Sequence, residues 1–394
     1  MRVTSMLPDM QYQLQQSSQG LATALQQVST GKRVNQLSDD PAASASMVRS
    51  LATSANLDTY ISTGSTVLSG LQTADSALSS VITSLNSAVT MGTSGANGTL
   101  TSANRAGIAL QVQSLLSSVV ARANSSYQGA YVFAGSASTT PPFVQASSSF
   151  TSSATSLTAT TPLSAGSTTT ISDAQTGQTF TFKAAAGDTV ATLTQAVATA
   201  VSGGTLSSGT SASVDGAGHL AFTSAGGIVA SSNDAALGSL SATAGSTVAN
   251  AYAYVGNNNV NSVAIGDSQT VDSNLSGSQI FTANSNVIQS LGKLITALQS
   301  GNQTQIGDAT ASISTALNFV SQQRIPLNNN ITQINSQESY LSQEKVTLST
   351  QQTALVGINL AEAATNLSQA SLTNSAVLAA AAKVVPQTLL DYLK

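Results

Sequence analysis

Hydrophobic positions in the last quarter of the chain predict a long helix that packs along other helices. From Ile313 to Leu355 the apolar and facing positions recur in alternating steps of four and three, which is the a/d spacing of a coiled coil. At about 1.5 Å per residue, such a helix is roughly 65 Å long, so we expect a rod. The positions are Ile313, Leu317, Val320, Arg324, Leu327, Ile331, Ile334, Glu338, Leu341, Lys345, Leu348, Gln352 and Leu355.

A last helix is predicted between Gly357, a possible kink, and Pro386. Many of its facing positions are small or polar, so we expect a thin contact that depends on partners. They are Leu360, Ala364, Leu367, Ser371, Asn374, Leu378, Ala381 and Val385.

The N-terminal part predicts a short helix that would pair with this last one. A mobile leader is expected over residues 1–9. An apolar stripe then follows, formed by Leu14, Leu21, Leu25 and Val28, and Gly31 ends it. The next helix should begin with Asp40 as N-cap and Pro41 in its first turn. Asp39 and Asp40 could instead form a metal or acid pair, but adjacent acids before a helix more commonly cap it.

Two further long helices make the chain a helical bundle. The four-and-three spacing recurs from Leu57 to Val89, which predicts a second helix over about 41–89, then a turn over 91–99 and a third helix over about 100–127. Another helix is expected from Val287 to Leu298. The fold class is therefore mainly α, a long antiparallel bundle of N- and C-terminal segments.

The centre of the chain predicts a β-rich outer domain. Tyr127, Tyr131, Val132 and Phe133 lie between glycines and prolines and favour a helix end followed by a hairpin. We interpret them as a hydrophobic cluster that packs between the rod and the outer domain. The alternative is an aromatic binding site for a ligand.

Between residues 144 and 250, alternating patterns predict two pairs of strands separated by one helix. The strands are expected at 168–171, 179–182, 211–215 and 219–222, and the helix over 188–201 with Asp188 as N-cap. A hairpin turn is expected at 215–218, and the one histidine, His219, is interpreted as a surface polar group. Short strands over 251–281 should pair with the hairpin near Tyr131.

The composition argues against several classes of function. Only 7% of the residues are charged and the net charge is −4. The sequence therefore lacks the excess of positive charge that binding to nucleic acid or to an anionic membrane requires. The sequence has no cysteine, no run of about 18 apolar residues and no signal-peptide pattern, and it has no HExxH or Gly-rich phosphate loop. We therefore expect no enzyme, no cofactor and no metal site.

Three stretches carry a resemblance to a known family. The run STGKRVNQLSDDPAASASMVRS at 29–50 resembles the N-terminal signature of the bacterial flagellin and hook-associated protein family. The end of the chain, at 358–394, is similar to its C-terminal partner, and the ANSSYQGAYVFAG segment agrees with both. The opening MRVT, Pro41 and the ending LLDYL resemble a hook-filament junction branch of that family more than flagellin.

The resemblance implies a structural subunit of the flagellum. The expected divisions are a terminal coiled-coil core (1–40 and 357–394), a helical rod (41–143 and 251–356) and an outer insert (144–250). The chain would be secreted unfolded by the flagellar type III apparatus and form the ring on which flagellin assembles. Its implied partners are other copies of itself, a neighbouring hook-associated protein, flagellin, and a cytoplasmic chaperone on the C-terminal helix.

The residues expected at subunit interfaces are the apolar positions of the two ends. They are Leu14, Leu21, Leu25, Val28, Leu360, Leu367, Leu378, Leu389, Leu390 and Tyr392. Flagellin itself is the alternative function, and an enzyme or a glycan-binding role of the insert are the others; no motif supports the enzyme.

Overall fold

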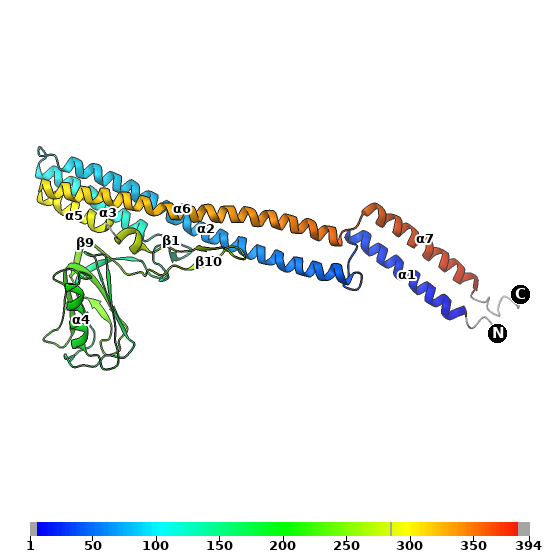
Figure 1. Ribbon diagram of the computed structural model, residues 1–394, viewed down its shortest axis with the longest axis horizontal. Coiled ribbons are helices and arrows are strands. Elements are labelled where there is room, and N and C mark those ends of the chain that lie inside the picture. Colours follow the sequence, from blue (N-terminus) through cyan, green and yellow to red (C-terminus); the bar gives the residue numbers. More distant parts are fainter. Residues whose placement is uncertain (1–5, 284–285, 385–394) are drawn as a thin grey trace. The chain divides into compact units, whose positions relative to one another are not determined.

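The computed structural model describes residues 6–283 and 286–384. The chain forms two compact units. Unit 1 combines Met1–Ser62 with Glu338–Lys394, and unit 2 is Thr63–Gln337. The two longest helices, α2 (Pro41–Gly95) and α6 (Gln303–Val356), contribute residues to both units (Figure 1).

The helical part of unit 2 is built as the hydrophobic spacing predicts. Segments of α2 and α6 lie beside α3 (Ser102–Ala123) and α5 (Val287–Ser300) (Figure 1). Predicted a/d positions such as Leu71, Leu78, Ile313 and Val320 are at most 2% exposed. The long-helix prediction is therefore confirmed, and the mainly α architecture with a β-rich part is confirmed with it.

The predicted seam position Arg324 is charged and pairs with a carboxylate of α2. Arg324 donates from Nε and Nη2 to the two carboxylate oxygens of Asp75, both at 2.8 Å. This bidentate pair holds α2 and α6 antiparallel in one register, because a shift of either helix by one turn would separate the fork from its carboxylate.

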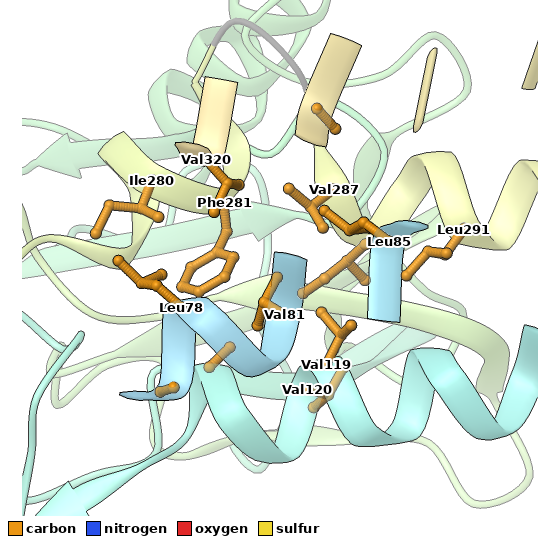
Figure 2. Close-up of a cluster of buried hydrophobic side chains, with 14 of the residues drawn as sticks. Leu78, Val81, Leu85, Val119, Val120, Ile280, Phe281, Val287, Leu291 and Val320 are labelled. Atoms are coloured by element: carbon orange, nitrogen blue, oxygen red, sulfur yellow. The ribbon is translucent and has the colours of Figure 1, made fainter. Parts of the chain in front are cut away.

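The helical part of unit 2 has a hydrophobic core to which helices and strand residues both contribute. Figure 2 shows the ring of Phe281 among Leu78, Val81 and Val320. Phe281 belongs to η1 (Ser278–Thr282), a single turn of π-helix that precedes α5. Its ring also meets Phe133 and Phe143 edge to face, with centroids 5.3 and 5.4 Å apart.

The turn expected over residues 91–99 is wrong for its first half, because α2 continues to Gly95. Gly92 and Gly95 lie inside the helix, where the missing side chains allow close packing. A Cβ on Gly92 would lie 2.2 Å from Thr310 Oγ1, and one on Gly95 would lie 2.3 Å from a Leu298 methyl group. These glycines therefore serve helix contact rather than chain reversal.

Gly92→Val is expected to destabilise unit 2 by about 1–3 kcal/mol, because the added side chain overpacks the contact with α6. Gly107→Ala in α3 is the matched control, since a Cβ there meets nothing within 4 Å. The control should stabilise by roughly 0.5–1 kcal/mol through helix propensity. Urea unfolding of both variants measures the difference, and equal stabilities would contradict the packing role of Gly92.

The outer part of unit 2 is a seven-stranded antiparallel sheet covered by one helix. Its central path runs β5-β4-β7-β3-β8, with β6 beside β7 and β9 beside β3. The strands are β3 (Phe143–Ser152), β4 (Thr168–Asp173), β5 (Thr179–Lys183), β6 (Ser211–Val214), β7 (Leu220–Ser232), β8 (Leu240–Ala242) and β9 (Thr247–Tyr254). The helix α4 (Val190–Ser202) buries Leu193 and Val197 against the sheet (Figure 1).

The predicted strand-strand-helix-strand-strand order is confirmed for β4, β5, α4, β6 and β7. The sheet also contains β3, β8 and β9, which the hydrophobic pattern did not predict.

Asp188 is not the N-cap of α4. Thr189 holds that position, and Asp188 Oδ2 accepts the Ala185 N–H at 2.8 Å instead. At the expected hairpin turn, Asp215 Oδ1 accepts the backbone N–H groups of Ala217 and His219, and these bonds hold the Asp215 pKa below its usual value.

Two small hairpins join helices and sheet. They are β1 (Ser126–Tyr127) with β2 (Ala130–Tyr131), and β10 (Ser262–Ala264) with β11 (Thr270–Asp272). Fully buried Phe133 packs in the core, whereas Tyr127 and Tyr131 are half-buried. The Leu275 N–H donates to the Val132 carbonyl, so the later segment does pair with this region.

Asp234 is a buried carboxylate that fixes the loop before β4. Burial alone would raise its pKa, but hydrogen bonds from Ser167, Ala236 and Ser164 hold the pKa of Asp234 below its usual value. Its stabilising effect is therefore complete above about pH 4 and is lost as the pH falls through the lowered pKa.

Asp234→Asn should destabilise the sheet by about 1–3 kcal/mol at pH 7, because an amide cannot accept all these donors. Its effect should be smaller at pH 3, which lies below the usual pKa of an aspartate in the unfolded chain. Hydrogen exchange of β4 and β7 amides at both pH values measures this, with exposed Asp267→Asn as the control. A loss that is the same at pH 7 and pH 3 would contradict the charge-dependent role.

Candidate assembly interface

The two ends of the chain form an antiparallel helix pair within unit 1. The helices are α1 (Met6–Thr30) and α7 (Leu360–Val384), and they lie side by side (Figure 1). Because α1 begins at Met6, residues 6–9 are helical and the leader expected over 1–9 is wrong for them. Residues 1–5 lie outside the described part of the chain.

The contact between these helices is thin. Its more buried positions follow alternating steps of four and three on both helices, but only Ala24 and Ala363 are below 9% exposure. The positions are Met10, Leu14, Ser17, Leu21, Ala24 and Val28 on α1, and Ala363, Leu367, Ala370, Asn374, Val377 and Ala381 on α7. Since no described large side chain of the pair is fully buried, little of its stability comes from its own core.

A polar pair lies at the centre of this contact. Ser17 Oγ donates to Asn374 Oδ1 at 3.2 Å, across 357 positions of the sequence. Polar partners at facing positions of a coiled coil specify register at a cost in stability. The α1–α7 contact is therefore specific but weak.

The predicted interface residues divide into two groups. Leu14, Leu21, Val28 and Leu367 face the helix partner and are half-buried. Leu25, Leu360 and Leu378 face away and are 51%, 63% and 50% exposed. Leu389, Leu390 and Tyr392 lie outside the described residues.

The register expected for α7 is therefore wrong for contacts inside one chain. Ala363, Ala370 and Val377 take the places that we assigned to Ala364, Ser371 and Leu378. A helix rich in alanine offers several stripes of similar apolarity, and the spacing alone does not choose among them. That the outward-facing leucines contact other subunits stays a prediction.

The loop between α1 and α2 forms a tight joint with the end of α6. The Arg33 N–H donates to the Val356 carbonyl at 2.7 Å, and Lys32 and Gly357 form an antiparallel bridge. Arg33 Nη2 also donates to Asp40 Oδ2 at 3.0 Å and to the Leu355 carbonyl at 3.2 Å. Sequence reasoning missed Arg33, although a charged residue in a loop of so uncharged a chain is a usable signal.

Of the two acids of this loop, Asp40 caps α2 and Asp39 holds the turn before it. Asp40 Oδ1 accepts the Ala43 N–H at 2.9 Å, which is N-cap geometry for α2, and Pro41 is the first helical residue. This bond and the Arg33 side chain hold the pKa of Asp40 below its usual value. Asp39 Oδ2 accepts the N–H groups of Asn35 and Gln36, which lowers the pKa of Asp39 likewise.

Exposed apolar side chains are concentrated in unit 1. Ten of the thirteen exposed large hydrophobic side chains in the described chain belong to it. They are Tyr12, Leu25, Leu37, Val48, Leu51, Tyr340, Val346, Leu360, Leu372 and Leu378. Unit 1 is less than a third of the chain by its residue ranges, so this concentration makes it the candidate for an interaction surface.

Within residues 6–283 and 286–384, no cluster of three or more His, Cys, Asp or Glu side chains is arranged to hold a metal ion. None of the described helices combines the length and the hydropathy needed to span a bilayer.

The N-terminal part of the chain is similar to known flagellar proteins. Residues 5–138 match the family model of the bacterial flagellin N-terminal helical region. The chain is 35% identical over 127 residues to flagellar hook-associated protein 3 of Salmonella typhimurium, covering 32% of this chain and 40% of that protein. It is 39% identical over 121 residues to the same protein of Escherichia coli, covering 30% and 38%.

The chain thus spans about two fifths of the length of these relatives. A solved structure of a putative flagellar hook-associated protein from Vibrio parahaemolyticus has a similar fold, with a TM-score of 0.51. It is 16% identical and covers 81% of this chain and 100% of its own. The resemblance to flagellin and hook-associated proteins inferred from the sequence is confirmed for the N-terminal part of the chain.

Proposed function

We propose that this chain, whose residues 5–138 match the family model of the bacterial flagellin N-terminal helical region, is a structural subunit of the flagellum at the junction between hook and filament. The observation that carries the proposal is the apolar surface of unit 1 around a weakly packed helix pair. Similarity to hook-associated protein 3 in two bacteria favours the junction over the filament itself. The role is structural rather than catalytic.

The helix pair suits a subunit that is exported unfolded and folds during assembly. The chain has no cysteine and seven prolines, so disulfides and many slow proline isomerisations do not oppose passage through a narrow channel. The polar Ser17–Asn374 layer fixes the pairing of the ends once neighbouring subunits supply the missing apolar surface. Copies of the chain would then close into a ring through contacts between different faces.

The C-terminal helix also offers a surface for an export chaperone. Leu360, Leu372 and Leu378 of α7 are 50–72% exposed, so a partner could cover them without opening unit 2. The same residues would later contact neighbouring subunits, which makes chaperone binding and assembly mutually exclusive. The division into terminal core, rod and outer insert follows from this scheme as part of the proposal.

Deletion of the gene tests the role. The expected strain keeps its hooks, lacks filaments and releases filament subunits into the medium, and a plasmid copy restores attachment. Filaments that persist in the deletion strain would contradict the junction role. Purified chain that polymerises alone into long filaments would favour flagellin instead.

A further inference from the structure

The turn between α2 and α3 contains the one Asn-Gly pair of the sequence, Asn97-Gly98. Both residues are exposed and lie outside the helices, since α2 ends at Gly95 and α3 begins at Ser102. A glycine after an asparagine leaves the peptide nitrogen between them open, because it has no Cβ that would shield this nitrogen. An asparagine in this position can react with its own backbone.

The Asn97 side chain is folded back over that peptide nitrogen. Asn97 Oδ1 accepts the Thr99 N–H at 3.1 Å, and a bond from an asparagine to the backbone two residues on bends the side chain over the peptide between them. The Gly98 N–H itself donates no hydrogen bond in the described part of the chain. The turn therefore brings the side-chain amide carbon of Asn97 to a backbone nitrogen that is free to attack it.

Two donors point at the Asn97 side-chain oxygen. Besides its N–H, Thr99 supplies its hydroxyl, which donates to Asn97 Oδ1 at 2.9 Å. Attack on Cγ moves negative charge onto this oxygen, and donors placed about 2.7–3.1 Å from such an oxygen stabilise the transition state. Thr99 thus forms an oxyanion hole for a reaction of its own neighbour.

Asn86 is a comparison within the same unit that lacks these features. It is also exposed and is followed by a small residue, Ser87, but both lie inside α2. A helix uses the N–H of each interior residue in its own i to i−4 hydrogen bonds, so the Ser87 nitrogen is not free. We therefore expect Asn86 to be inert where Asn97 reacts.

We propose that Asn97 is a site of intramolecular deamidation that the Thr99 donors promote. The Gly98 nitrogen loses its proton to solvent and bonds to Asn97 Cγ. The Cγ–Nδ2 bond then breaks, and Nδ2 takes up a proton from solvent and leaves as ammonia. Water opens the resulting cyclic imide at either of its carbonyls, which leaves an aspartyl or an isoaspartyl residue. The balance requires water alone.

The product changes both the charge and the backbone of this turn. Each event adds one negative charge to a chain whose net charge is −4. The isoaspartyl form also routes the backbone through the former side chain. It therefore rearranges a turn in which the Asn97 carbonyl accepts the Leu100 N–H at 3.2 Å. This modification is independent of the flagellar role proposed above.

The test incubates the full-length chain at mildly alkaline pH and follows each asparagine by mass spectrometry of tryptic peptides. Asn97 should convert while Asn86 stays intact. Thr99→Val removes the hydroxyl donor but keeps the N–H, and it should slow the conversion about tenfold. Thr93→Val is the matched control, since Thr93 is an exposed threonine of α2 whose hydroxyl bonds to the Val89 carbonyl instead. Its rate should stay within about twofold of wild type.

The wild-type chain unfolded in guanidinium chloride is the second comparison, and it decides the matter if Thr99→Val fails to fold. Unfolding removes the Thr99 donors but keeps the Asn-Gly pair, so conversion should be slower there than in the folded chain. Equal or faster conversion in the unfolded chain, or an unchanged rate in folded Thr99→Val, would overturn the proposal. So would an Asn97 side chain that stays intact in the folded wild type.

Discussion

Cells that carry Leu378→Asp are expected to lose filament attachment. Leu378 lies on the outer side of α7 and is 50% exposed in the single chain. If a neighbouring subunit covers it, an unpaired carboxylate there costs on the order of 3 kcal/mol. That corresponds to more than about a hundredfold loss of association. Motility and electron microscopy of complemented deletion cells measure the effect.

Unit 2 should stay folded in this variant, because its hydrophobic core is formed without residues of α7. Leu110→Asp is the matched control, since Leu110 is a 65% exposed leucine of helix α3 in unit 2. The control should build filaments. Normal filaments in Leu378→Asp cells, or equal loss in the control, would contradict the role of the terminal helices.

Phe281→Ala should destabilise unit 2 by about 3–5 kcal/mol, because it empties the centre of the core. Phe281 is fully buried and links the helices to Phe133 and Phe143 through edge-to-face ring contacts (Figure 2). Urea unfolding followed by far-UV circular dichroism measures the loss, which should move the midpoint of the unit 2 transition.

Phe281→Leu keeps most of the apolar volume and should cost on the order of 1–2 kcal/mol. The difference in unfolding free energy between the two variants separates the cost of the cavity from the cost of losing the aromatic contacts. If Phe281→Ala unfolds at the same urea concentration as wild type, η1 does not anchor this core.

The long helices were predictable because their buried residues are large and regularly spaced. Leu71, Leu78, Ile313 and Val320 each differ strongly in hydropathy from their polar neighbours, so the period of the pattern is unambiguous. Strand β5 was predictable for the same reason, since threonine and phenylalanine alternate along it.

Other parts depend on contacts that no local pattern encodes. Gly92 and Gly95 read as turn residues, yet they are needed where Thr310 and Leu298 approach the helix. Strand β3 pairs with β7, β8 and β9, and its serine-rich sequence has no clear alternation. Tertiary packing decided these elements, and it overrode local propensity.

The candidate interface was predictable in place but not in register. Its location follows from the weakly apolar ends of the chain, whereas the choice of Ala363 over Ala364 depends on how α1 and α7 meet. The joint around Arg33 combines residues more than 300 positions apart, so sequence spacing could not reveal it.

Hydrogen exchange of the dilute monomer tests the central claim most directly, namely that the terminal helices need other subunits for their stability. The account predicts that amides of α1 and α7 exchange orders of magnitude faster than those of α3 and α5 in unit 2, and that they become protected on assembly. Protection of α1 and α7 in the free monomer equal to that of α3 and α5 would contradict it.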